Sequence, residues 1–334
     1  MPSLPIVRPS PGLLRRRTAL LQAAAVLAPW PAAAQAPAGS PTLRLIVPFT
    51  PGTGIDLIAR QVGPRLAERL GRPVVVDNRP GASGNLGTEA VVRAPADGHT
   101  LLVTVNTLVM APALYAKLGF DPVKDLDPVS LTSWGQLLLV ASRTSGIQSA
   151  ADFVARARAR PGHLNYASPG NGTPHHLAME LVKHHARIFV THIPYRGTAP
   201  AVTDLLGGQV EAMFLPIHVA LQHVKAGSLR ALAISSDKPH PLLPEVPPLR
   251  SLGLGELDVE MWYGVLAPKG TPRPLIERLN TELRAILALP EVKAAFETQG
   301  MAPAHGPADE FRALIERDAA RWAQVIRAQG IRAD

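Results

Sequence analysis

Short apolar runs alternate, over most of the chain, with segments whose apolar residues recur every three or four positions. The clearest periodic segment is 56–70, in which Ile58, Val62 and Leu66 share one face. Gly71 is well placed to end this helix. Alternation of short strands with amphipathic helices predicts an α/β fold with largely parallel sheets and right-handed crossovers.

The other expected elements continue this alternation, and a proline- and glycine-rich loop is expected at 242–255. Ser149 and Asp152 form a capping box at the start of a helix that Pro161 and Gly162 end. Strands are expected at 43–49, 73–76, 100–105, 136–141, 164–167, 187–193, 209–214, 229–234 and 261–266. Further helices are expected at 174–185, 199–206, 217–226, 272–288, 290–298 and 307–329.

Two turns join a strand to a helix in a way that suits a small anion. In one, residues 50–54 connect a strand to a helix that opens near Asp56. In the other, residues 168–173 connect the strand 164–167 to the next helix. Free backbone N–H groups and the positive end of the helix dipole converge at such a turn, which favours a phosphate or a carboxylate. No catalytic group stands beside either turn, so the pair predicts capture of an anion rather than its chemical conversion.

The first 36 residues have the layout of an export signal. Arg8 and 15–17 make a basic start, 18–28 is almost entirely apolar, and small residues fill 31–36. The apolar stretch is too short to span a bilayer. The arginine run also admits a twin-arginine signal, so the export pathway and the cleavage site stay open. We expect an exported protein without residues 1–36.

Length, cysteine content and charge narrow the class of protein. The 334 residues exceed the ~250–300 at which one core usually stops growing, so two lobes are expected. The chain has no cysteine, which leaves it without disulfides or a lipid attachment point. Removing 1–36 takes away four arginines and no acid, so the net charge falls from +8 to +4. This net positive charge suits an anionic ligand. The basic residues are scattered among acidic ones, however, and form no basic patch of the kind that binds nucleic acid.

A dinucleotide-binding turn is the first alternative. Gly52 and Gly54 follow a strand and open a helix, and Asp77 stands where a ribose-binding acid would lie. Against this, the third glycine position is Leu57, and the charge of Asp56 would oppose a diphosphate.

Three other kinds of site are also disfavoured. The adjacent pairs His175-His176 and His184-His185 do not share a helix face, so no metal is expected. The glycine- and serine-containing turns at 80–84 and 167–170 miss the spacing of a serine-hydrolase elbow. The acids of 121–127 are interrupted by prolines and a lysine and form no calcium loop. We expect neither an enzyme nor a cofactor.

Taken in order, many segments resemble the extracytoplasmic solute receptors of the tripartite tricarboxylate transporter family, often called Bug receptors. The segments that carry this resemblance are 46–49 with Pro51, Gly52 and Asp56, 74–81 with Gly84 and Asn85, 97–102, 112–115, 121–125, 128–130, 164–168 with 170–173, 193–197, 199–201, 203–208, 225–227, 229–233, 266–268 and 270–272. Each motif is weak alone, but their order and spacing over about 43–332 are specific.

The resemblance implies a two-lobed, type II-like periplasmic binding protein, with a mainly parallel sheet in each lobe and a cleft between the lobes. Lobe 1 would combine 41–140 with 266–334, and lobe 2 would span 141–265, with crossovers near 140–141 and 263–264. Such a receptor lies free in the periplasm, captures a small organic carboxylate and delivers it to a membrane permease. The alternative is a ligand-sensing receptor that presents its closed form to a sensor kinase. The ligand, the partner and the oligomeric state stay open.

Candidate ligand contacts follow from placement in this fold. One polar end of the ligand would meet the first turn, and a carboxylate would meet the second. Arg196 would supply charge at the next strand-to-helix loop. The candidates are Phe49, Thr50, Gly52, Thr53, Gly54, Asp56, Thr104, Asn106, Thr107, Ser168, Asn171, Gly172, Thr173, Tyr195, Arg196, Phe214 and Leu215.

Three positions depart from the family pattern. Thr53 stands where a second glycine is usual, Leu215 where an aspartate is common, and Leu108 where a polar residue is frequent. The loss of an acid and of a polar group predicts a ligand with an apolar body and no amine.

Overall fold

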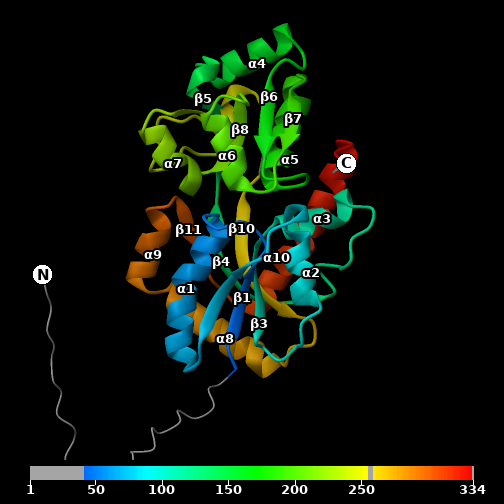
Figure 1. Cartoon of the computed structure of the whole chain (residues 1–334), viewed down its shortest axis with the longest axis vertical. Helices are drawn as coiled ribbons and strands as arrows, with labels where there is room; N and C mark the ends of the chain where they lie inside the picture. The colour runs from blue at the N-terminus through cyan, green and yellow to red at the C-terminus, as the bar shows by residue number, and fades with distance from the viewer. Residues whose placement is uncertain (1–40, 255–258, 333–334) are drawn as a thin grey trace, which may run out of the picture. The chain divides into compact units, whose positions relative to one another are not determined.

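The fold is described here from a computed structural model, which covers residues 41–254 and 259–332; the expected export signal at 1–36 lies outside them. Within these residues the strands form two sheets, each packed with helices, and both belong to one unit, Ser40–Asp334 (Figure 1). The chain is therefore an α/β protein with two lobes, as the sequence predicts. None of the helices in the described ranges combines the length and apolar character that crossing a membrane requires.

The first lobe contains a six-stranded sheet in the order β11-β4-β10-β3-β1-β2. Its strands are β1 (Leu43–Val47), β2 (Val74–Asn78), β3 (Thr100–Val105), β4 (Leu126–Gly135), β10 (Met261–Pro268) and β11 (Met301–Pro303). Its helices are α1 (Gly54–Leu70), α2 (Asn85–Val92), α3 (Thr107–Leu114), α8 (Arg273–Leu287), α9 (Pro290–Glu297) and α10 (Ala308–Ala328), with a short turn η1 (Ala82–Gly84).

The second lobe contains a five-stranded sheet in the order β7-β6-β8-β5-β9. Its strands are β5 (Leu137–Ser142), β6 (Asn165–Ser168), β7 (Thr191–Pro194), β8 (Ala212–Pro216) and β9 (Leu229–Ile234). Its helices are α4 (Ala150–Ala159), α5 (Pro174–Ala186), α6 (Thr198–Leu206) and α7 (Ile217–Lys225), with short turns η2 (Arg143–Ser145) and η3 (Leu249–Leu252).

Both sheets are mixed rather than mainly parallel. β1 is parallel to β2 and β3, and β6 is parallel to β7 and β8. The strands that carry the chain between lobes run the other way: β10 is antiparallel to β3 and β4, and β5 to β8 and β9. The chain leaves the first sheet after Gly135 and returns to it at Met261. The lobe boundaries expected near 140–141 and 263–264 stay a prediction.

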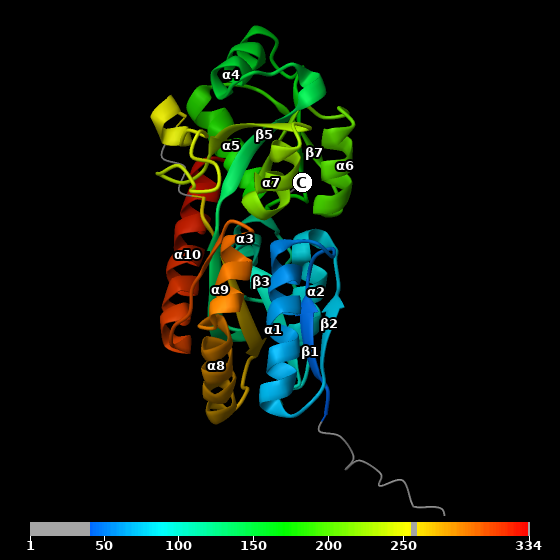
Figure 2. The same ribbon diagram turned by 90° about the vertical axis from the view of Figure 1, so that its left-hand side faces the viewer.

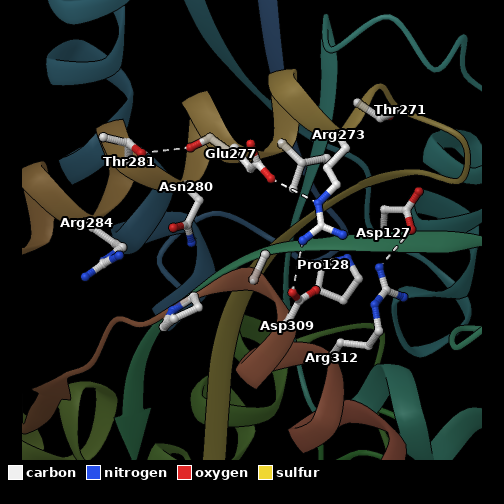
Figure 3. A pocket seen from close by; sticks show the side chains of 13 residues that line it. Asp127, Pro128, Thr271, Arg273, Glu277, Asn280, Thr281, Arg284, Asp309 and Arg312 are labelled. Carbon is white, nitrogen blue, oxygen red and sulfur yellow. Dashed lines mark hydrogen bonds and ion pairs between the residues drawn. The ribbon is translucent and has the colours of Figure 1, made fainter.

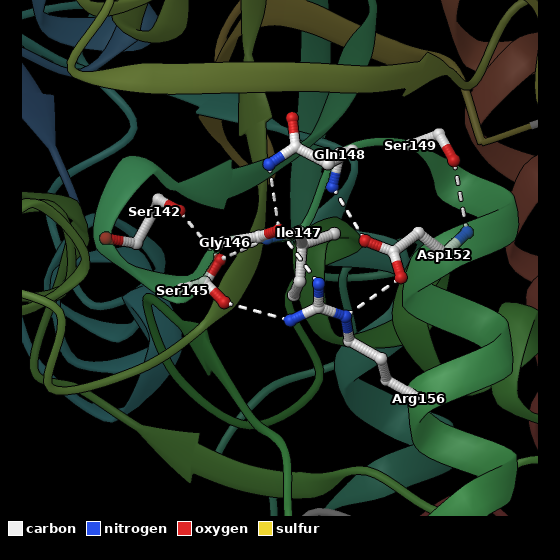
Figure 4. A network of polar contacts seen from close by, with 8 residues as sticks. All are labelled: Ser142, Ser145, Gly146, Ile147, Gln148, Ser149, Asp152 and Arg156. Carbon is white, nitrogen blue, oxygen red and sulfur yellow. Dashed lines mark hydrogen bonds and ion pairs between the residues drawn. The ribbon is translucent and has the colours of Figure 1, made fainter.

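Local signals account for the helix boundaries that the sequence predicts. Gly71 ends α1 with φ 63°, a left-handed conformation that glycine adopts without strain. α4 begins with the predicted capping arrangement (Figure 4): the Asp152 N–H donates to Ser149 Oγ at 3.1 Å. The Asp152 carboxylate also accepts from the Gln148 N–H at 2.8 Å and from Arg156 Nε at 2.8 Å. One aspartate therefore fixes both the start and the first turn of α4.

Four elements escape the periodicity argument: α2, α3, β4 and β11. α3 is apolar on nearly all sides, so it has no polar face to mark it. α2 and β11 are short, and β4 contains Pro128 and Gly135, two residue types that are uncommon inside strands. The strand expected at 73–76 forms β2, an edge strand of the first sheet, and Val75 in it is 45% exposed.

Buried polar contacts tie the C-terminal helices to the first sheet. Trp262 Nε1 on β10 donates to Asp318 Oδ2 on α10 at 2.7 Å. Asn280 on α8 is buried and donates through Nδ2 to the backbone oxygens of Val129 at 2.7 Å and Gly306 at 2.9 Å. The Val129 contact is buried and the Gly306 contact is partly buried, so one side chain satisfies acceptors that water reaches little or only in part.

We expect Asn280→Ala to lower the free energy of unfolding by about 1–3 kcal/mol, since it leaves one buried and one partly buried acceptor without this donor. The measurement is urea unfolding followed by circular dichroism. Thr281→Ala, at the exposed next position of the same helix, should change the value by less than ~0.5 kcal/mol. Equal effects of the two substitutions would contradict the role given to Asn280.

Candidate ligand-binding site

Helices of both lobes begin where the lobes meet. α1 and α3 follow strands β1 and β3 of the first sheet, and α5, α6 and α7 follow strands β6, β7 and β8 of the second. Figure 2 shows α6 and α7 directly above α1 and α2. The first turn of a helix carries N–H groups without intrahelical acceptors. The lobe boundary therefore gathers hydrogen-bond donors from both sides.

A cavity of about 610 Å³ lies at this boundary. Five of the predicted contacts line it together, two from the first lobe and three from the second: Phe49, Thr50, Asn171, Tyr195 and Arg196. Prediction from sequence missed its other lining residues, which are Pro80, Gly81, Ala82, Ser83, Gly84, Leu86, Tyr115, Pro169, Gly170, Pro194 and Gly197. Many of these residues belong to the motifs that carry the family resemblance, so those motifs could have identified them from the sequence.

Tyr115 joins the two lobes beside this cavity. Its hydroxyl donates to the Asn171 backbone oxygen at 2.9 Å and lies 3.2 Å from Ser83 Oγ. The Ser83 side chain packs closely against Gly170 at the same place: a Cβ on Gly170 would lie 2.5 Å from Ser83 Oγ. Gly170 also has φ 147°, so a side chain there would be strained as well as crowded. This hydrogen bond links a loop of the first lobe to a loop of the second at the cavity.

The carboxylate of Asp56 occupies the first anion turn. It is buried and accepts from the Gly52 N–H at 2.9 Å, from Arg60 Nε at 3.0 Å and from Asn78 Nδ2 at 3.0 Å. Burial alone would raise its pKa, but the hydrogen bonds from Arg60, Gly52 and Asn78 outweigh burial and hold the pKa below its ordinary value. Asp56 and the Gly52 amide thus shape the loop at the start of α1.

The second turn is likewise braced by its own side chains. Ser168 Oγ accepts from the Gly170 N–H at 3.2 Å, and Thr173 Oγ1 donates to the Gly170 oxygen at 2.8 Å. The Gly172 N–H donates to His176 Nδ1 at 3.0 Å. Groups that the sequence suggested as carboxylate donors are therefore engaged within the loop. Their role as ligand contacts stays a prediction.

Three stacked aromatic rings, those of Tyr166, His176 and His192, lie next to this turn. The rings of His176 and His192 lie 4.2 Å apart, and that of Tyr166 lies 4.7 Å from His192. Burial lowers the pKa of His176 to about 4 and that of His192 to about 3, so both rings are neutral near pH 7. Within residues 41–254 and 259–332, no three histidine or acidic side chains gather as a metal site would need.

One serine–histidine contact needs separate examination, because it is the pair that a hydrolase would use. Ser168 Oγ lies 2.7 Å from His192 Nε2. Ser168 has no exposed surface, and its hydroxyl also contacts the oxygen and the N–H group of Gly170. A nucleophile must reach its substrate, and this hydroxyl does not line the cavity. The contact holds the turn in place.

Arg196 and Tyr195 face the cavity from the loop between β7 and α6. The Tyr195 hydroxyl donates to Asp204 Oδ2 at 2.7 Å, and burial together with this acceptor raises its pKa to about 12. The hydrogen bond to Asp204 therefore holds the Tyr195 ring in place as part of the cavity wall. Arg196 is exposed at the cavity, and in the part of the chain that the structure describes no carboxylate pairs with it. Its guanidinium is the cation at this site available to an anion.

The remaining candidates lie elsewhere. Thr53 and Gly54 line a separate chamber of about 30 Å³. Phe214 and Leu215 have no exposed surface and belong to β8 in the middle of the second sheet. The candidates outside both cavities are Gly52, Asp56, Thr104, Asn106, Thr107, Ser168, Gly172, Thr173, Phe214 and Leu215.

A further cavity, of about 460 Å³, lies entirely in the first lobe (Figure 3). Its charges largely compensate one another. Asp127 pairs with Lys269 at 3.0 Å and with Arg312 at 2.9 Å, while Arg273 pairs with Glu277 at 2.9 Å. No element of the second lobe contributes to its wall, so opening and closing of the lobes would not enclose a ligand there.

Comparison with known proteins identifies the family. The model of the family described as "Tripartite tricarboxylate transporter family receptor" (TctC) matches residues 58–331. The chain belongs to this family. The Bug-type resemblance seen in the sequence is thereby confirmed, and the two-lobed fold is shared with solved members.

Three relatives of this TctC-family chain are informative. BugT of Bordetella pertussis is 37% identical over 290 residues, covering 86% of this chain and 89% of BugT. The structure of Rhodopseudomonas palustris Rpa4515 with adipate has a TM-score of 0.84 and 32% identity, covering 87% of this chain and 98% of that one. MatC from the same organism, with bound malate, has a TM-score of 0.80 and 30% identity, covering 85% and 98%.

We expect Asp56→Asn to destabilise the folded protein by roughly 1–3 kcal/mol at pH 7, because an amide cannot accept from all three donors. The unfolded-state pKa is near 3.8 and the folded pKa is lower, so ionised Asp56 contributes fully above that pH. The difference between wild type and variant should shrink as the pH falls below about 4. Urea unfolding at pH 7 and pH 3 measures it.

The exposed acid Glu316 on α10 provides the control for this comparison. Glu316→Gln should alter stability by less than ~0.5 kcal/mol at either pH. A difference between wild type and Asp56→Asn that stays constant from pH 7 to pH 3 would contradict the charged role of Asp56.

Proposed function

We propose that this protein is an extracytoplasmic receptor that closes around a small organic carboxylate and hands it to a tripartite tricarboxylate-type permease. The observation that carries the proposal is the cavity of about 610 Å³ between the lobes, with Arg196 exposed at it. A cavity of this size suits a small metabolite. The relatives with adipate and malate support a carboxylate as its chemical class.

Binding without chemical conversion agrees with this cavity. Its polar lining consists of one guanidinium, hydroxyl and amide side chains and the backbone of several glycines. These groups hydrogen-bond an anion, but they include no base placed against an accessible nucleophile. The charge of Arg196 then draws the carboxylate in, and closure strengthens each contact as water leaves the cleft.

Export to the periplasm is part of the proposal. Two observations support export: residues 1–36 have the composition of an export signal, and the chain belongs to a family of transporter receptors. The partner is either the permease or, in the alternative, a sensor kinase that reads the closed form. Cross-linking of the exported protein in its native host, with and without ligand, separates the two by the partner that is recovered.

We expect a thermal-shift screen to find organic acids that raise the melting temperature of the purified protein, while the matching neutral amides do not. Stabilisation grows with ligand concentration as RT ln(1 + [L]/Kd), so a titration also ranks the acids. Adipate, malate, citrate and hexanoate are suitable first probes. The proposal fails if no acid stabilises the protein at millimolar concentration, or if the amides stabilise it equally well.

Arg196→Gln should weaken binding of the best acid about five- to thirty-fold, which corresponds to losing one charge-assisted hydrogen bond of ~1–2 kcal/mol. Isothermal titration calorimetry at low salt gives the comparison, because screening weakens the attraction of an exposed charge. Arg160→Gln, an exposed change in the same lobe and away from the cavity, is the matched control. An unchanged affinity in Arg196→Gln would remove this residue from the site.

A further inference from the structure

The loops that follow β6 and β7 in the second lobe form one unit at the cavity between the lobes. The Tyr195 N–H donates to the Ser168 oxygen at 2.9 Å, and the Gly197 N–H donates to the Pro169 oxygen at 3.0 Å. Both bonds join backbone to backbone, so they fix the two loops to each other whatever side chains the loops carry. Arg196 lies between the two donors and therefore keeps its place relative to the loop after β6.

Tyr115 holds this pair of loops against the first lobe. It follows α3, is half-buried and lines the same cavity. Its hydroxyl donates to the Asn171 backbone oxygen at 2.9 Å and lies 3.2 Å from Ser83 Oγ. A tyrosine hydroxyl has one hydrogen, so the bond to Asn171 uses its whole donor capacity. The hydroxyl is thus committed to a contact between the lobes rather than to donation toward a solute.

A strained turn of the first lobe meets the same loops. In η1, Ala82 has φ 46° and Ser83 has φ 54°, a left-handed backbone conformation that costs energy in residues other than glycine. Ser83 lies against Gly170, where an added Cβ would come within 2.5 Å of Ser83 Oγ. Such strain persists only where surrounding contacts hold it. The contacts of Ser83 with Tyr115 and Gly170 are among those that hold η1.

Thr50 marks a second place where the lobes touch at this cavity. A Cβ on Gly197 would lie 2.9 Å from Thr50 Cγ2, so the loop after β7 packs on the first lobe. Thr50 Oγ1 is buried there and makes no hydrogen bond with residues 41–254 or 259–332. Packing alone therefore joins the lobes at Thr50, whereas Tyr115 adds a directional bond that is lost when the lobes part.

We propose that the bond from the Tyr115 hydroxyl to the Asn171 oxygen is an interlobe latch, which holds Arg196 at the cavity and slows the release of any bound acid without selecting among acids. The inference rests on the proposed function and adds a positioning residue to it. The latch forms only when the lobes are together and does not include the ligand, so it favours every ligand that binds between the lobes by the same factor. Release requires the lobes to part, so the effect of the latch lies in the dissociation rate.

Binding of malate, adipate, citrate and hexanoate to wild type, Tyr115→Phe and Thr281→Ala tests this. Calorimetry gives the affinities, and stopped-flow tryptophan fluorescence gives the rates. Tyr115→Phe keeps the ring and removes the latch, so we expect it to weaken every acid that wild type binds by the same factor, about three- to ten-fold, through faster dissociation. Thr281→Ala removes an exposed hydroxyl of the first lobe that does not line this cavity, and it should leave affinities and rates within about two-fold of wild type.

A second variant separates the latch from the hydroxyl next to it. Ser83→Ala removes that hydroxyl and leaves the bond from Tyr115 to Asn171, so it should weaken binding less than Tyr115→Phe does. Circular dichroism of the ligand-free variants checks that each is folded. The inference is overturned if Tyr115→Phe binds every acid as tightly as wild type, if its loss falls on some acids only, or if the loss lies in the association rate. Binding of no acid at all by wild type would instead refute the proposed function.

Discussion

The boundary between the lobes encloses more hydrogen-bonding groups than the protein itself satisfies. Thr50 Oγ1, both ring nitrogens of His175 and Nε2 of His218 are buried there without a partner in the described part of the chain. A buried polar group without a partner costs about 1–3 kcal/mol, so closure over an empty cleft is disfavoured. A polar solute that supplies those partners offsets the cost. The same groups that penalise the empty closed form therefore make closure depend on a ligand.

This constraint explains why so many side chains near the site do not face the cavity. Asp56 braces the first turn through three donors, and His176 and Ser168 brace the second. Each loop thus keeps its shape before a ligand arrives, which reduces the ordering cost of binding. Candidate residues read from the loop sequences divide into those that hold the loop and those that face the solute. Position along the chain alone did not separate these two groups.

More of the fold than of the candidate site can be predicted from the sequence. Amphipathic periodicity and capping residues predict α1 and α4 because those signals are local, whereas α3 lacks a polar face and β4 contains Pro128, which is uncommon inside a strand. The site depends on contacts between segments far apart in the chain. The contact from Tyr115 to Asn171 spans 56 positions, and His218 meets Gly54 across the lobe boundary. No local pattern encodes either contact, so they appear only once the two sheets are packed.

The apolar ligand body that Leu215 suggests stays a prediction. Leu215, which replaces a common aspartate, is fully buried in β8 and lines neither cavity. Phe49 and Leu86 supply apolar side chains to the wall of the larger cavity. Arg196 adds an exposed guanidinium there, whose attraction for an anion acts at long range and is weakened by salt. Such a lining suits the proposed carboxylate with an apolar body.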